Sequence, residues 1–182
     1  MTIQTVQMKW SGLLVLALCG LGACRIHKDA VALRSEKTLV AEQNTDWLRY
    51  KVYLLPADTG HNGKHNRKAN LVLSIMVINM KDNTSPLRRL CTNLDDYNRY
   101  YEYLLNGCKN DIVVHAGNEE LYPVYYAFEN NYDAFPFETI NVGFEYDLRK
   151  KGLSSLKNLE LIYTDKIFSR TTISCNLNYP NK

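Results

Sequence analysis

The alternation of apolar and polar residues along the chain predicts a protein built mainly of β-strands. In the stretch 47–55, Tyr50, Val52 and Leu54 share one side at the period of two that strands have. The stretch 71–78 is apolar at nearly every position, which is typical of a central strand covered on both faces. Further strands are predicted at 111–115, 121–128, 139–146, 159–163 and 167–176. Short strands separated by turn residues favour an antiparallel β-sandwich with an immunoglobulin-like architecture.

Two of these strands carry information about their position. Pro123 lacks an amide hydrogen, so the strand over 121–128 is expected at a sheet edge or at a bulge. The stretch 139–146 places apolar residues on one face and polar residues or glycine on the other. This pattern predicts a strand with one side in water.

One stretch has helical spacing instead. Apolar and aromatic residues recur three and four positions apart between Leu94 and Leu105. Asn93 is suited to cap the start of a helix, and Gly107 is suited to end it. We therefore expect one short helix over about 94–105.

The N-terminus has the organisation of an export signal. Lys9 supplies a basic start, and an apolar run from about Trp10 to Ala23 follows. A run of roughly 14 residues cannot cross a hydrocarbon core that needs about 20. Its end, Leu21-Gly22-Ala23-Cys24, resembles the lipobox of bacterial lipoproteins. The resemblance implies a signal peptide over 1–23, a diacylglyceryl group on the Cys24 thiol and acylation of the new amino terminus.

Lipidation of Cys24 would hold the protein on a membrane, because two or three acyl chains anchor stably. The alternative is an ordinary cleaved signal in which Cys24 has no role. In Gram-negative lipoproteins, Arg25 after the lipidated cysteine implies sorting to the outer membrane. Residues 24–46 are polar and are expected to form the lipidated N-terminus and a tether, followed by a single domain over 47–182.

Composition limits the partners. The chain has 22 basic and 19 acidic residues, and removal of Lys9 with the leader leaves 21 basic residues. A net charge of about +2 gives no reason to expect nucleic acid as a partner. We also expect no cofactor.

Three cysteines remain in the mature domain for at most one disulfide. A helix over 94–105 is about 18 Å long and separates Cys91 from Cys108, whereas a disulfide needs Cα atoms within roughly 7 Å. We therefore expect Cys175 to pair with Cys91 or with Cys108, or no bridge at all.

Several residue pairs suggest chemistry, but each fits a structural role better. His61 and His65 are four apart in a glycine-rich loop that is a poor helix former, so no metal site is expected. The Cys108 thiol and the His115 imidazole match no local nucleophile and base signature. The pairs Asp95-Asp96 and Glu119-Glu120 point in divergent directions on a helix or strand. We predict no catalytic residue and no enzyme activity.

The tyrosines give the one indication of a binding surface. Tyr100 and Tyr103 lie off the apolar stripe of the predicted helix, and Tyr125 points away from its apolar neighbours. Exposed together, these three would form an aromatic patch. The main hypothesis is a non-enzymatic interaction or accessory lipoprotein of the cell envelope with a protein partner. The alternatives are a glycan- or small-ligand-binding lipoprotein that uses these tyrosines, and a hydrolase of unrecognised type.

Overall fold

A computed structural model describes residues 37–56 and 71–180 of the chain. The predicted signal peptide, Cys24, most of the tether, and the pair His61 and His65 lie outside the described residues. None of the helices in the described part is long and apolar enough to cross a membrane.

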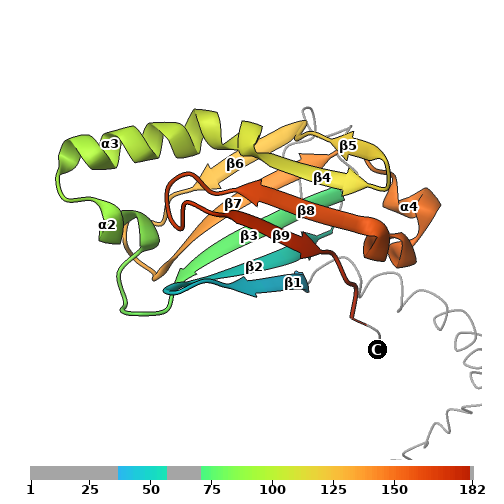
Figure 1. The fold of residues 1–182 in the computed structure, drawn as a ribbon, viewed down its shortest axis with the longest axis horizontal. Helices are drawn as coiled ribbons and strands as arrows, with labels where there is room; N and C mark the ends of the chain where they lie inside the picture. Colours follow the sequence, from blue (N-terminus) through green and yellow to red (C-terminus); the bar gives the residue numbers. More distant parts are fainter. Residues whose placement is uncertain (1–36, 57–70, 181–182) are drawn as a thin grey trace, which may run out of the picture. The chain divides into compact units, whose positions relative to one another are not determined.

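Five antiparallel strands form the first sheet, which we call sheet A (Figure 1). In spatial order they are β1 (Thr38–Asn44), β2 (Leu48–Leu55), β3 (Leu71–Asn79), β7 (Phe137–Phe144) and β6 (Tyr125–Glu129). The predicted strands at 47–55 and 71–78 are confirmed as β2 and β3. Strand β1 begins at Thr38, within the expected tether, because Val40 is apolar and packs into the core.

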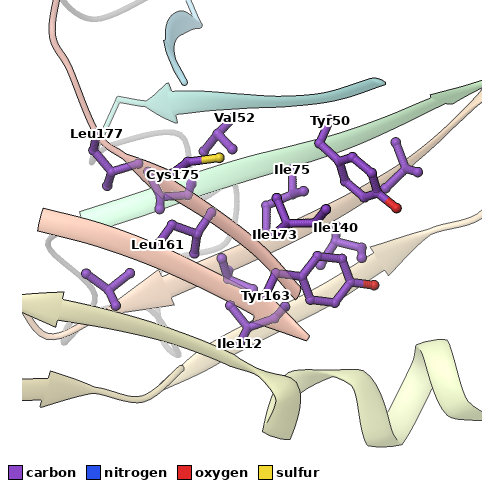
Figure 2. Close-up of a cluster of buried hydrophobic side chains, with 14 of the residues drawn as sticks. Tyr50, Val52, Ile75, Ile112, Ile140, Leu161, Tyr163, Ile173, Cys175 and Leu177 are labelled. Atoms are coloured by element: carbon purple, nitrogen blue, oxygen red, sulfur yellow. The ribbon is translucent and has the colours of Figure 1, made fainter. Parts of the chain in front are cut away.

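Four antiparallel strands form the second sheet, sheet B. In spatial order they are β5 (Glu119–Leu121), β4 (Ile112–Ala116), β8 (Leu159–Thr164) and β9 (Thr172–Asn176). The two sheets share one apolar core, in which Tyr50 of β2 and Tyr163 of β8 meet edge to face with ring centroids 6.4 Å apart (Figure 2). The prediction of a mainly β chain with two antiparallel sheets is confirmed.

A helical segment carries the chain from sheet A to sheet B. It consists of α2 (Pro86–Leu90), α3 (Leu94–Glu102), a π-helical turn η1 (Tyr103–Gly107) and a 3-10 turn η2 (Cys108–Asp111). The predicted helix is confirmed, and Asn93 caps it by accepting a hydrogen bond from the Asp96 amide at 2.8 Å. Tyr101 packs against Phe128 of β6 with ring centroids 6.0 Å apart, so the segment covers one open side of the sandwich.

The opposite side is closed where β1 meets the chain after β9. The Asn178 amide donates to the Val40 carbonyl at 2.8 Å, at the point where the register of β1 on β2 shifts. Two short elements, α4 (Leu148–Lys151) and η3 (Leu153–Asn158), connect β7 to β8.

Three local predictions differ from the structure. The single strand expected over 121–128 is two strands in different sheets, because Pro123 lies between β5 and β6 and interrupts the backbone pairing. The polar face of β7 is not in water: Thr139 and Asn141 are buried, and the Asn141 side chain donates to the Glu129 carboxylate of β6 at 2.6 Å. The last strand begins at Thr172 rather than at Ile167, because the preceding residues form a loop around Asp165.

Candidate binding surface at one end of the sandwich

Three connections that are far apart in sequence meet at the end of the sandwich that carries α2, on the left in Figure 1. The Met80 amide after β3 donates to the Trp47 carbonyl in the β1–β2 turn at 2.9 Å. The Asn79 amide donates to the Pro136 carbonyl before β7 at 2.8 Å. We call the surface formed by Trp47, Met80, Tyr132 and Phe135 the tip.

The β3–α2 connection is held by the Asn79 side chain, which is buried. Its amide nitrogen donates to Asp82 Oδ1 at 2.6 Å and to the Thr84 carbonyl at 2.9 Å. Its amide oxygen accepts from the Lys81 amide at 2.9 Å. Asp82 also forms an ion pair with Arg89 of α2. These contacts fix the backbone next to Met80.

The β6–β7 connection has an unusual backbone. Tyr132 and Asp133 both have positive φ, at 52° and 63°, a conformation that costs an L-residue about 1–2 kcal/mol. Two asparagine side chains support it. Asn130 accepts from the Tyr132 amide at 2.7 Å and donates to the Tyr97 hydroxyl at 2.8 Å, while Asn131 donates to the Phe135 and Phe137 carbonyls. Strained backbone that the surroundings hold in place is frequent at binding sites.

This backbone presents large apolar side chains to solvent. The exposed fractions are 81% for Tyr132, 54% for Phe135 and 41% for Met80. Phe135 stacks on Phe137 with centroids 5.4 Å apart, and the Arg89 guanidinium lies 5.6 Å from the centre of the Trp47 ring. Exposed aromatic side chains beside an arginine are typical of the centres of protein interfaces.

A buried carboxyl group lies beneath the tip. Glu138 of β7 is 1% exposed, and neither of its carboxyl oxygens has a hydrogen-bond partner among the described residues. Burial, together with the charge of Asp133, raises the pKa of Glu138 to about 7, although the nearby Ser85 hydroxyl and Leu87 amide favour the ionised form. Ser85, at the start of α2, donates to Asp133 Oδ1 at 2.5 Å.

The three tyrosines predicted to form a patch lie in different places. Tyr100 and Tyr103 are half-buried against the core, and the Tyr103 hydroxyl donates to Asp111. Tyr125 is half-buried opposite Gly143, on the face of sheet A that points away from the core. The structure therefore does not bring Tyr100, Tyr103 and Tyr125 together on one surface.

Cys91, Cys108 and Cys175 are all free thiols in the structure. The Cys108 sulfur lies 3.7 Å from the Tyr163 hydroxyl, and the Cys175 sulfur lies 3.5 Å from the Gln43 side-chain oxygen. Of the alternatives left open by the sequence, the structure has the one without a bridge.

The structure does not pair the Cys108 thiol with the His115 imidazole. Cys108 is fully buried, and burial raises the pKa of its thiol to about 11. His115 lies on the opposite face of β4 from the buried Val114, between Glu120 at 3.5 Å and Glu160 at 3.8 Å. Within the described ranges, no three His, Cys, Asp or Glu side chains are arranged to hold a metal ion.

The tip and Glu138 were missed at the level of sequence. The tip joins three loops whose proximity depends on the sheet order, so no local pattern contains it. Glu138 had a visible signal: it is in phase with Ile140, Val142 and Phe144, which places a carboxyl group on the apolar face of a strand.

No protein-family model, no curated protein and no solved structure matches this chain.

Proposed function

We propose that this protein is a lipoprotein of the cell envelope, anchored in the outer membrane through Cys24, that uses the tip to bind a folded envelope protein without catalysing a reaction. The observation that carries the proposal is the Tyr132 ring, 81% exposed on a backbone with two consecutive positive φ angles and close to exposed Phe135. Strain and exposed aromatic area both cost stability, so selection for binding is the simplest reason to keep them together.

Strand β1 leads the chain to the tip. It begins at Thr38 and runs about 20 Å to the turn that contains Trp47, at 3.4 Å per residue. The start of β1 therefore lies at the opposite end of the sandwich from the tip.

The chemistry of the tip also fits a protein. Tyr132, Phe135 and Trp47 are aromatic, and Arg89 next to Trp47 can form hydrogen bonds with a partner. The glycan-binding alternative through Tyr100, Tyr103 and Tyr125 has less support than the tip, because these three side chains are half-buried.

The immunoglobulin-like architecture is part of this proposal. It is supported by a two-sheet sandwich with a candidate recognition surface formed by loops at one end, as in immunoglobulin domains. The likeness is one of architecture, since β1, β2 and β3 are consecutive neighbours in one sheet rather than arranged in the ABED order.

The proposal is tested by in-cell crosslinking and purification of the full chain, with two matched double variants. One combines Tyr132→Ser with Phe135→Ser at the tip. The other combines Tyr122→Ser with Val124→Ser, which removes side chains that are 62% and 52% exposed outside the tip. We expect one defined envelope protein with the wild type and the control, and at least a tenfold loss with the tip variant. Equal recovery from both variants would reject the tip as the binding surface.

A further inference from the structure

Sheet A has a second face, which points away from the core and which we call the outer face. Its side chains alternate along each strand with those that pack into the core, and several of them are large and apolar. The following residues of the outer face are half-buried and lie outside the apolar core: Tyr53, Val72, Met76, Ile78, Tyr125 and Phe137. Neighbouring apolar side chains outside a core are typical of a binding surface.

Two polar side chains lie next to each other in the middle of the outer face. Ser74 of β3 pairs in register with Asn141 of β7, and these residues are 0% and 8% exposed. Neither the Ser74 hydroxyl oxygen nor the Asn141 side-chain oxygen has a hydrogen-bond partner among the described residues. A buried polar group without a partner lowers the stability of a protein. Two such groups side by side are typical of a site that another molecule completes.

The orientation of the Asn141 amide is fixed by its neighbour on β6. The Asn141 side-chain nitrogen donates to the Glu129 carboxylate at 2.6 Å. An ionised carboxylate only accepts hydrogen bonds, so the Asn141 nitrogen has to face Glu129 and the Asn141 oxygen has to face elsewhere. This oxygen needs an N–H or O–H donor, whereas the Ser74 hydroxyl still has its hydrogen to donate. The pair therefore offers one acceptor and one donor.

The acetamido group of an N-acetylated sugar matches this pair. It carries one N–H, which can donate to Asn141 Oδ1, and one carbonyl, which can accept from the Ser74 hydroxyl. Tyr53 lies directly opposite Ser74 on β2, and Tyr125 lies opposite Gly143 on β6, so an aromatic ring stands on each side of the polar pair. Rigid aromatic rings beside polar groups suit sugars, which have apolar C–H faces and polar edges.

The spacing of the two tyrosines indicates the length of the ligand. Tyr53 on β2 and Tyr125 on β6 are three strand spacings apart, about 14 Å at about 4.8 Å per spacing. This separation is longer than one sugar ring, so the ligand is an oligosaccharide. Tyr125 belongs to the patch expected from the sequence, but Tyr100 and Tyr103 are not part of this site.

We propose that the outer face binds an oligosaccharide containing N-acetylated amino sugars, whose acetamido N–H donates to Asn141 and whose acetamido carbonyl accepts from Ser74. Tyr53 and Tyr125 stack on sugar rings at the two sides. Ser74 and Asn141 are shielded from water in the free protein, so neighbouring side chains move aside on binding. Met76 follows Ser74 on the same face, and its unbranched side chain has the rotational freedom to do so. None of the tip residues takes part, so this binding and the proposed function can fail independently.

Isothermal titration calorimetry of the full chain in detergent tests the proposal with two soluble probes, tetra-N-acetylchitotetraose and cellotetraose, which has hydroxyl groups in place of the acetamido groups. We expect the N-acetylated tetramer to bind at least tenfold more tightly. Ser74→Ala should lower its affinity at least tenfold without lowering the midpoint of urea unfolding, because the lost hydroxyl has no partner in the free protein. Ser174→Ala on the exposed side of β9 is the matched control and should bind as wild type does.

Three results would overturn the proposal: no saturable binding of the N-acetylated tetramer, equal affinity for cellotetraose, or an unchanged affinity in Ser74→Ala. Tighter binding of an alanine tetrapeptide with blocked ends would assign the polar pair to a peptide and reject the glycan. The nitrogen shift of the Asn141 side-chain amide in the wild type reports the same contact without a variant. It should move with the N-acetylated tetramer, and a shift that stays unchanged at saturation would also reject the site.

Discussion

Replacement of Glu138 by glutamine should stabilise the protein, and the gain should depend on pH. The folded-state pKa of Glu138 is about 7 against an ordinary value of 4.5, because burial penalises the ionised form. At 1.36 kcal/mol per pH unit, ionising Glu138 in the folded state costs about 3 kcal/mol more than in the unfolded chain. Glu138→Gln removes this cost and keeps the shape of the side chain.

The direction in which this stability difference changes with pH follows from the higher pKa of Glu138 in the folded state. Below pH 4.5 the carboxyl group is protonated in both states, so wild type and Glu138→Gln should have similar free energies of unfolding. As pH rises from 4.5 to 7, the unfolded chain loses this proton first, and the wild type loses stability. Above pH 7 the variant should be more stable by up to about 3 kcal/mol.

Urea unfolding at pH 4.5, 6, 7 and 8.5, followed by far-UV circular dichroism, measures this difference. Glu129→Gln on the neighbouring strand is the matched control, because Glu129 is exposed. A Glu138→Gln variant that is less stable than wild type at pH 8.5, or a difference that does not vary with pH, would refute the account of a buried, unpaired carboxyl group.

Three further predictions follow from other parts of the molecule. Asp165→Ala should lower the free energy of unfolding by at least about 3 kcal/mol in a urea titration. The buried carboxylate accepts hydrogen bonds from the Tyr50 hydroxyl at 2.5 Å and from three backbone amides, and bonds to a charged group contribute about 1.5–3 kcal/mol each. Asp165→Asn should lower the free energy of unfolding by a smaller amount. Alkylation without reductant should label Cys91 first and Cys108 last in the folded protein. After denaturation, mass spectrometry should find all three mature-domain thiols labelled. If two of the three labels are missing, Cys175 forms a disulfide bridge. Cys24→Ala should move the protein from the membrane pellet to the soluble fraction, and equally firm binding of the variant would rule out a lipid anchor on Cys24.

Local sequence patterns predicted most of the individual strands and the helix, but not how the strands are distributed between the two sheets. The alternation in 47–55 and the apolar run in 71–78 became β2 and β3, since side-chain period and burial are local properties of a strand. Asn93 capped the helix as expected. Pro123 signalled an irregularity, yet the transfer of the chain from sheet B to sheet A at this residue depends on long-range pairing that no local pattern contains.

The candidate site could be predicted only in part for the same reason. The phase of Glu138 with Ile140 and Val142 was readable in the sequence, but the neighbouring Ser85 and Asp133 come from other segments of the chain. The positive φ of Tyr132 was not readable, because tyrosine rarely adopts it and only the surrounding asparagines hold it. Periodicity alone indicates Tyr100, Tyr103 and Tyr125 as a patch, and periodicity does not report whether other residues cover that face.

The most direct test of the tip is photo-crosslinking in intact cells from a benzophenone amino acid placed at position 132 or at position 122 of the full chain. Tyr132 and Tyr122 are both well exposed, at 81% and 62%, so both probes reach solvent. We expect one discrete adduct with an envelope protein from position 132, its loss when Phe135→Ser is added, and no adduct from position 122. The same adduct from both positions, or none from position 132, would contradict the claim that this surface binds a partner.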